Sequence, residues 1–259
     1  MTDSRHKIYA YWGSRPENAI AYAKRLRQTL VDLSAIHPVF ANWKQGHTPA
    51  IIPVFSSTPP ELPAVVRLIE EGRHYADGSG ELMPDIGFSV GIKSNLARRC
   101  SCMLDVTAGG YSGHRRFPNT LNLESFVNDL RDAELQSFEA YRSELRAIAT
   151  AWEPDWASVY CSAYWQRLAT AAGKWLDIQS GWMTYLSPDY ARHVVPPAGA
   201  IVEAAPAAGG MVLVATKESF DVTNPTHLAA ADAIQVALAP LNVTPWRPND
   251  RAITNSSDA

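Results

Sequence analysis

Apolar positions along the chain alternate in some stretches and recur at helical spacing in others, which predicts both strands and helices. Alternating or continuous apolar runs predict strands at 7–12, 85–93, 98–107, 119–124, 157–162, 182–186, 200–204 and 211–215. Helical spacing predicts helices from the capping box at 14–17 onward, over roughly 60–75, 125–151 and 163–172, briefly after residue 187, and over 225–239. Predicted strands often follow one another directly. The order therefore favours an α+β fold, with a mixed, largely antiparallel sheet packed by several helices in a single compact domain, over a doubly wound parallel sheet.

Local signals set the expected ends of these elements. Ser14-Arg15-Pro16-Glu17 has the spacing of a capping box, so the first helix should begin there. His37-Pro38 should end that helix, with residues 39–43 extended. Ser94-Asn95 should form a hairpin turn, and Pro240 should end the last helix. The domain is expected to span residues 1–246, followed by a flexible polar tail at 247–259.

The longest predicted helix, 125–151, lies in an acidic part of the chain. Between residues 124 and 155, eight acidic side chains face three basic ones, a local balance of −5 in a chain of net charge −3. On a helical wheel Asp129, Asp132 and Glu139 project opposite the apolar stripe. These carboxylates are expected to face either solvent or a partner, and the sequence leaves both readings open.

Composition limits the classes of function. The 259 residues are 46% hydrophobic and 19% charged, as in an ordinary globular protein with a sizeable core. The small net charge gives no general attraction to nucleic acid or anionic lipid. No apolar run reaches the roughly 18 residues of a membrane helix, and the polar start at residues 1–7 has no signal segment. These features, with three cysteines, predict a cytoplasmic protein without a disulfide framework.

One short motif comes near to a catalytic pattern. Gly110-Tyr111-Ser112-Gly113-His114 resembles a nucleophile elbow, but that turn needs glycine two residues after the serine, where this chain has His114. A flexible turn is the better interpretation. A hydrolase that uses Ser112, His114 and a distant aspartate stays as the alternative of a different class, and a structural subunit or adaptor is a third.

Metal and nucleotide sites have weaker support. Cys100 and Cys102 lie two residues apart on a predicted strand, but two further ligands at suitable spacing are missing nearby, so buried and inert cysteines are expected. Gly209-Gly210 precedes a strand, whereas a phosphate loop follows one. The sequence therefore predicts no catalytic residue, no metal site and no cofactor.

The eight tryptophans divide by their surroundings. Five have apolar neighbours and are expected in the core: Trp12, Trp152, Trp156, Trp165 and Trp182. Three lie beside polar or loop residues, and one of them is expected to contact a partner: Trp43, Trp175 and Trp246.

Four segments carry a resemblance to a known family. They are Tyr11-Trp12-Gly13-x-Arg15-Pro16-Glu17, Trp152-Glu153-Pro154-Asp155-Trp156, Gly181-Trp182-Met183-Thr184-Tyr185-Leu186, and the stretch from Gly209 to Asn224-Pro225-x-His227. In this order they resemble the immunity protein 52 family of bacterial polymorphic-toxin systems. The resemblance implies a non-enzymatic antidote that binds a secreted toxin, often one delivered by type VI secretion. It also implies that the toxin is a nuclease of the restriction-endonuclease fold. It transfers no toxin-contact residue, so Asp129, Asp132 and Glu139 rest on charge alone.

Overall fold

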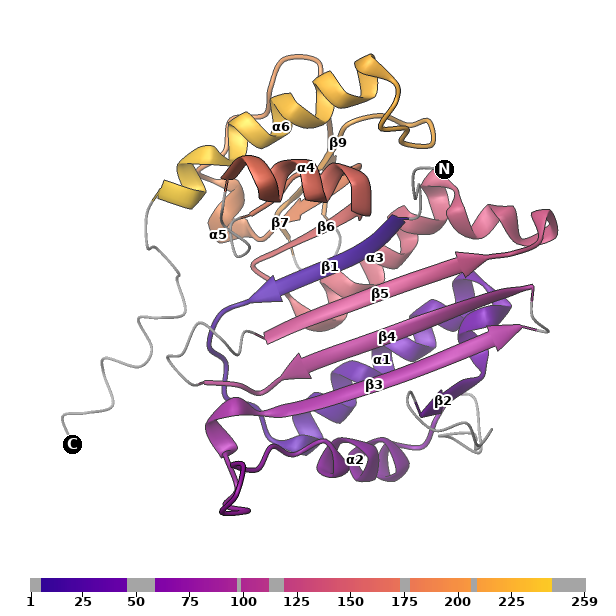
Figure 1. The fold of residues 1–259 in the computed structure, drawn as a ribbon, viewed down its shortest axis with the longest axis vertical. Coiled ribbons are helices and arrows are strands. Elements are labelled where there is room, and N and C mark those ends of the chain that lie inside the picture. Colours follow the sequence, from indigo (N-terminus) through magenta and orange to yellow (C-terminus); the bar gives the residue numbers. More distant parts are fainter. Residues whose placement is uncertain are drawn as a thin grey trace. The chain divides into compact units, whose positions relative to one another are not determined.

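The computed structural model describes residues 6–45, 59–96, 99–111, 119–172, 178–205 and 209–243 (Figure 1). Contacts divide the chain into two compact units. Unit 1 contains residues 1–10 and 133–246, and the described part of unit 2 lies within residues 11–132. The predicted tail, 247–259, lies outside the described residues.

Unit 2 contains four strands in the order β2-β3-β4-β5. They are β2 (Trp43–Gln45), β3 (Phe88–Leu96), β4 (Cys100–Ala108) and β5 (Asn119–Val127), and each neighbouring pair is antiparallel. Burial alternates along β3 and β4, as the period of two requires when one face is covered. Leu104 pairs with Ile92 on one side and Leu123 on the other, so aliphatic side chains cross the buried face in register.

Helices α1 (Ala19–Ile36) and α2 (Leu62–Glu71) pack together, and α2 contacts β3 (Figure 1). Leu26, Leu30 and Leu33 form the buried stripe of α1. The predicted start of this helix was wrong by several residues. Asn18 is the cap, because its Oδ1 accepts the Ala21 N–H at 2.9 Å. Glu17 does not close a capping box, since its Oε1 binds Arg25 at 2.8 Å.

Unit 1 contains strands in the order β1-β6-β7-β9-β8, where β1 (His6–Trp12) runs on into unit 2. The others are β6 (Trp156–Cys161), β7 (Met183–Leu186), β8 (Ile201–Ala204) and β9 (Met211–Val214). β6–β7, β7–β9 and β8–β9 are antiparallel pairs. Gly210 has φ +85°, and a Cβ there would lie 2.1 Å from the Leu186 carbonyl oxygen. Glycine at position 210 therefore lets the segment just before β9 pass close to the backbone at the end of β7.

Helix α3 (Phe138–Trp152) packs on β6 and β7, α4 (Ser162–Ala172) on β6, and α5 (Pro188–Ala191) on β7. The last helix is α6 (Pro225–Val243). An aromatic cluster lies at the centre of unit 1, where the Trp182 ring contacts His6, Phe138 and Tyr141. The α+β class and the antiparallel pairing are thus confirmed. Among the described residues, no helix is long and apolar enough to cross a membrane.

The predicted helix at 125–151 is wrong in its first half. β5 continues to Val127, because residues 121–127 pair with β4 and tertiary pairing outweighs helical spacing. A 3-10 helix, η3 (Leu130–Gln136), follows, with a non-helical residue at Asp132. Only then does α3 begin, capped by Ser137, whose hydroxyl accepts the Ala140 N–H at 3.2 Å.

Three shorter predictions also fail. Residues 38–41 form a 3-10 helix, η1 (Pro38–Ala41), because His37 Nδ1 accepts the Val39 N–H and Pro38 suits a first helical turn. Ser94 and Asn95 lie inside β3, opposite Cys102 and Ser101. Helix α6 continues past Pro240 to Val243. The remaining short 3-10 segment in unit 2 is η2 (Pro84–Ile86).

Most of the tryptophan predictions hold. Four of the five expected core tryptophans are buried: Trp12, Trp152, Trp156 and Trp182. Trp165 is intermediate. Trp43, one of the three candidates for partner contact, is buried and stacks on Phe40 at a ring distance of 6.1 Å. Trp175 and Trp246 lie outside the described residues.

Candidate functional site

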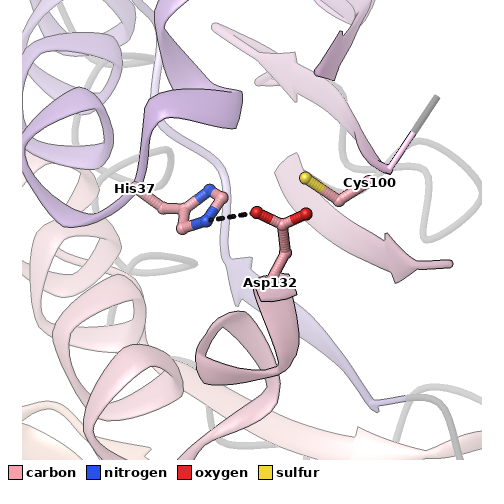
Figure 2. A group of neighbouring side chains, drawn as sticks. All are labelled: His37, Cys100 and Asp132. Atoms are coloured by element: carbon pink, nitrogen blue, oxygen red, sulfur yellow. Dashed lines mark ion pairs between the residues drawn. The ribbon is translucent and has the colours of Figure 1, made fainter. Parts of the chain in front are cut away.

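A cluster of potential metal ligands lies in unit 2 and joins three segments that are distant in sequence (Figure 2). His37 follows α1, Cys100 begins β4, and Asp132 belongs to η3. All three side chains are buried, and their ligand atoms lie within 4.8 Å of one another. The sequence did not bring these three together, because the spacing of His37 from the other two carries no local signal.

Arg99 neutralises the carboxylate of this cluster. Its Nε donates to Asp132 Oδ2 at 2.8 Å, and its Nη2 donates to Asp132 Oδ1. A fork of two parallel hydrogen bonds is the strongest common arrangement of a guanidinium and a carboxylate. Both oxygens of Asp132 are therefore engaged by Arg99, as a buried carboxylate requires, since the residue is only 2% exposed.

The tautomer of His37 follows from its hydrogen bond to the backbone. Nδ1 accepts the Val39 N–H at 3.1 Å, so it carries no proton. A neutral imidazole has only one unprotonated nitrogen. The proton therefore resides on Nε2, which lies 3.6 Å from Asp132 Oδ1 and directs its positive edge at that carboxylate.

These contacts do not fit a metal site. Nε2 of His37 could ligate a cation only if the imidazole lost its last proton or gave up the Val39 hydrogen bond. Asp132 is already held by Arg99. Burial, and after it the charge of Asp132, raises the pKa of the Cys100 thiol, whereas a metal needs the thiolate. The cluster is a structural ion network that ties the end of α1 and the start of β4 to η3.

The cysteines and the serine motif have simple placements. Cys100, Cys102 and Cys161 are free thiols, and each is buried, as expected for the first two. Ser112 and His114 lie outside the described residues. The hydrolase alternative therefore gains no geometric support.

The three predicted partner contacts do not share one helix face. Asp132 is buried in the ion network, which corrects the expectation that it projects outward. Asp129 precedes η3 and accepts a 2.6 Å hydrogen bond from Arg131 Nη2. The hydrogen bonds from Arg131 lower the pKa of Asp129 to about 2. Glu139 is in the first turn of α3 in unit 1, is exposed, and lies 3.3 Å from Arg142. Partner contact by Asp129 and Glu139 stays a prediction.

Glu144 and His6 are among the buried titratable groups of unit 1 that the sequence analysis did not select. Glu144 of α3 is fully buried, and neither of its carboxyl oxygens has a hydrogen-bond partner among the described residues. Burial raises its pKa well above the usual value and so favours the neutral acid. Burial also lowers the pKa of His6 to about 4, which leaves a neutral imidazole packed on Tyr141 and Trp182. The helical spacing of Glu144 from Tyr141 and Ile148 was a usable signal for its burial.

Comparisons with known proteins give a family and a fold. Residues 6–242 match the family model described as Immunity protein 52. Among solved structures, the chain is similar to the T6SS protein PA0821 of Pseudomonas aeruginosa, with a TM-score of 0.50 and 12% sequence identity. That match covers 91% of this chain and 72% of the other, and at this identity it concerns the fold alone. No curated protein matches the chain.

Proposed function

We propose that this chain, which belongs to the immunity protein 52 family, neutralises a cognate nuclease toxin by forming a stoichiometric complex with it. The observation that carries the proposal is the family match, which extends over residues 6–242 and so over almost all of the described structure. The family is one of immunity proteins, and on that ground the prediction of a non-enzymatic protein is confirmed.

Several finer points belong to the proposal. The family resemblance suggests that the toxin is a nuclease of the restriction-endonuclease fold. It also suggests that the toxin is delivered by type VI secretion. A nuclease acts on nucleic acid inside the cell, so its inhibitor must be present in the cytoplasm. Inhibition by binding needs an interface that buries about 1,600 Å² in total. Asp129 and Glu139 stay candidate contacts, with Arg131 and Arg142 as their present partners.

The test uses the protein encoded beside this chain's gene. Its catalytically inactive form should co-elute with the purified chain at an integral stoichiometry in size-exclusion chromatography with light scattering. Its active form should degrade DNA or RNA until an equivalent amount of the chain is added. A toxin of another immunity family is the matched control and should be unaffected. Absence of a complex refutes the proposal, and a neighbouring toxin that cleaves no nucleic acid refutes its nuclease part.

A further inference from the structure

A cavity of about 270 Å³ opens on the surface of unit 2. Its walls come from the residues before α1, from the segment between α2 and the start of β3, which includes η2, and from Tyr111 after β4. Glu17, Arg73, Leu82, Phe88 and Tyr111 are among the lining side chains. Tyr111 is fixed beside η2, because its N–H donates to the Asp85 carbonyl at 2.9 Å.

Exposed apolar side chains gather around this cavity. Among the described residues, eight large apolar side chains are exposed, and four of them belong to this region: Ile20, Tyr75, Leu82 and Tyr111. Leu82 and Tyr111 line the cavity itself. Tyr75 is opposite Leu82 in an isolated antiparallel bridge, and Ile20 follows the lining residue Asn18 by two positions. Exposed apolar side chains gathered around a pocket mark an interaction site rather than scattered surface, and tyrosine is among the residues enriched in binding hot spots.

The segment that carries Tyr75 and Leu82 is acidic. Residues 75–85, the purple loop between α2 and β3 in Figure 1, contain Asp77, Glu81 and Asp85 and no basic residue. Backbone hydrogen bonds from Ala76 to Glu81 (2.8 Å) and from Met83 to His74 (2.9 Å) hold it as a hairpin. Asp77, Glu81 and Asp85 form no ion pair with any residue that the structure describes. Their negative charge is therefore available to a partner.

The cations beside the cavity already have acidic partners. Arg73 is paired with Glu70, and its guanidinium lies 5.4 Å from the centre of the Phe88 ring. Glu17, only 7% exposed, binds Arg25 through Oε1. Its Oε2 has no hydrogen-bond partner within the described parts of the chain. A buried carboxylate oxygen without a donor, at the wall of a cavity, is a place where an incoming donor gains a hydrogen bond.

We propose that this cavity and the acidic hairpin, residues 75–85, are the surface that docks the cognate toxin. The cavity receives a large apolar side chain of the toxin, and Asp77, Glu81 and Asp85 face the basic surface with which a nuclease holds DNA. Charge complementarity selects this occupant, because an unneutralised acidic rim attracts a basic partner and repels an acidic one. The inference rests on the proposed function and adds to it a place and a kind of toxin surface.

The test compares two kinds of variant with matched controls from unit 1. Leu82→Ala and Tyr111→Ala should each raise the Kd for the inactive product of the neighbouring toxin gene by about ten- to hundredfold. Val195→Ala and Val236→Ala, which truncate apolar side chains that are exposed but lie outside the cavity lining, should leave the Kd within about threefold of the original. All four side chains are exposed, so the midpoint of thermal unfolding should not change and serves as the folding control.

The second kind of variant reverses charge. Asp77→Lys with Glu81→Lys should slow association about tenfold at 50 mM salt and flatten its dependence on salt. The control pair is Asp189→Lys with Glu218→Lys, which reverses two exposed carboxylates of unit 1. Its association rate should stay near that of the original chain.

The outcomes separate this inference from the proposed function. If the unmodified chain forms no complex with the neighbouring toxin, the proposed function fails. If it forms the complex and the cavity variants bind as well as their controls, the docking surface is refuted while the proposed function stands. If the cavity variants lose affinity but charge reversal changes neither rate nor salt dependence, the basic character of the docked surface is refuted.

Discussion

Two acidic segments of this chain differ in how their carboxylates are used. In the segment from Asp129 to Glu139, each carboxylate selected from the sequence has an arginine partner inside the protein. In the hairpin at 75–85, three carboxylates have none among the described residues. The first segment is the more prominent in a count of charges. The second has more charge left for another molecule.

The difference shows that the number of acidic residues in a segment does not measure its electrostatic field. Arg131 follows Asp129 by two positions, Arg142 follows Glu139 by three, and Arg99 reaches Asp132 from the adjacent strand end. The hairpin contains no basic residue that could pair locally. Partner recognition should therefore depend on the placement of cations as much as on the placement of anions.

The largest expected effect tests the internal use of Asp132. Asp132→Asn leaves Arg99 without its counter-charge and replaces one of the two acceptor oxygens by an amide NH2 donor that faces other donors, so we expect a loss of about 3 kcal/mol in the free energy of unfolding. Urea denaturation measures it. Asp129→Asn, on the exposed side of the same segment, is the control and should leave the urea midpoint nearly unchanged. Equal stability of the two variants would show that Asp132 contributes no more to folding than Asp129 does.

A third kind of carboxyl group extends the comparison of the two acidic segments. Glu144 is buried with no partner among the described residues, so Glu144→Met should stabilise the protein by about 1–3 kcal/mol at neutral pH. Burial raises its pKa, so the folded state keeps a proton that the unfolded state releases above the ordinary value of 4.5. The unmodified protein should therefore lose stability through this group as pH rises from there. Urea denaturation at pH 5.5 and pH 8 should show a larger gain for Glu144→Met at pH 8. A stabilisation by Glu144→Met that is smaller at pH 8 than at pH 5.5 would contradict the raised pKa of Glu144.

A smaller effect compares the two segments in binding. Glu81→Lys should slow association with the toxin about threefold at 50 mM salt, because it reverses a charge that has no ion-pair partner among the described residues. Glu139→Lys should have a weaker effect, because Arg142 already screens Glu139. Stopped-flow measurements at two salt concentrations give both rates. A change in association rate for Glu139→Lys as large as that for Glu81→Lys would indicate that the start of α3 also belongs to the toxin interface.

The smallest effect is a titration. The hydrogen bonds from Arg131 hold the pKa of Asp129 at about 2, so Arg131→Ala should raise it toward the ordinary 3.8. The carboxyl carbon chemical shift of Asp129, followed by NMR against pH, reports the change. Asp221, whose pKa is lowered by hydrogen bonds from Thr223, is an internal reference whose titration should stay the same in both proteins. An Asp129 midpoint already near 3.8 in the unmodified chain would show that the pair does not persist in solution.

The sequence predicted strands more accurately than it predicted the region between β5 and α3. Alternating apolar residues are a direct consequence of a sheet with one covered face, so β3, β4 and β5 were recognised. The helix predicted at 125–151 failed because Ser125 and Phe126 pair with β4, and only the partner strand supplies that information. The burial of Asp132 depends in the same way on Arg99 and His37, which lie far from it in sequence. The cavity could not be predicted either, since its walls come from separate elements.

The division of the chain also has a consequence for its synthesis. The described part of unit 2 lies within one continuous stretch, residues 11–132, and it separates the two parts of unit 1 in sequence. On the ribosome, the described part of unit 2 has been made once Asp132 has emerged, whereas β6, the neighbour of β1 within unit 1, is made later. Unit 2 should therefore fold first during translation. The first residues of unit 1 should complete their packing within that unit only when its later strands have been made. A truncated chain that ends at residue 132 is the natural object for seeing whether the docking surface forms before the rest of the protein exists.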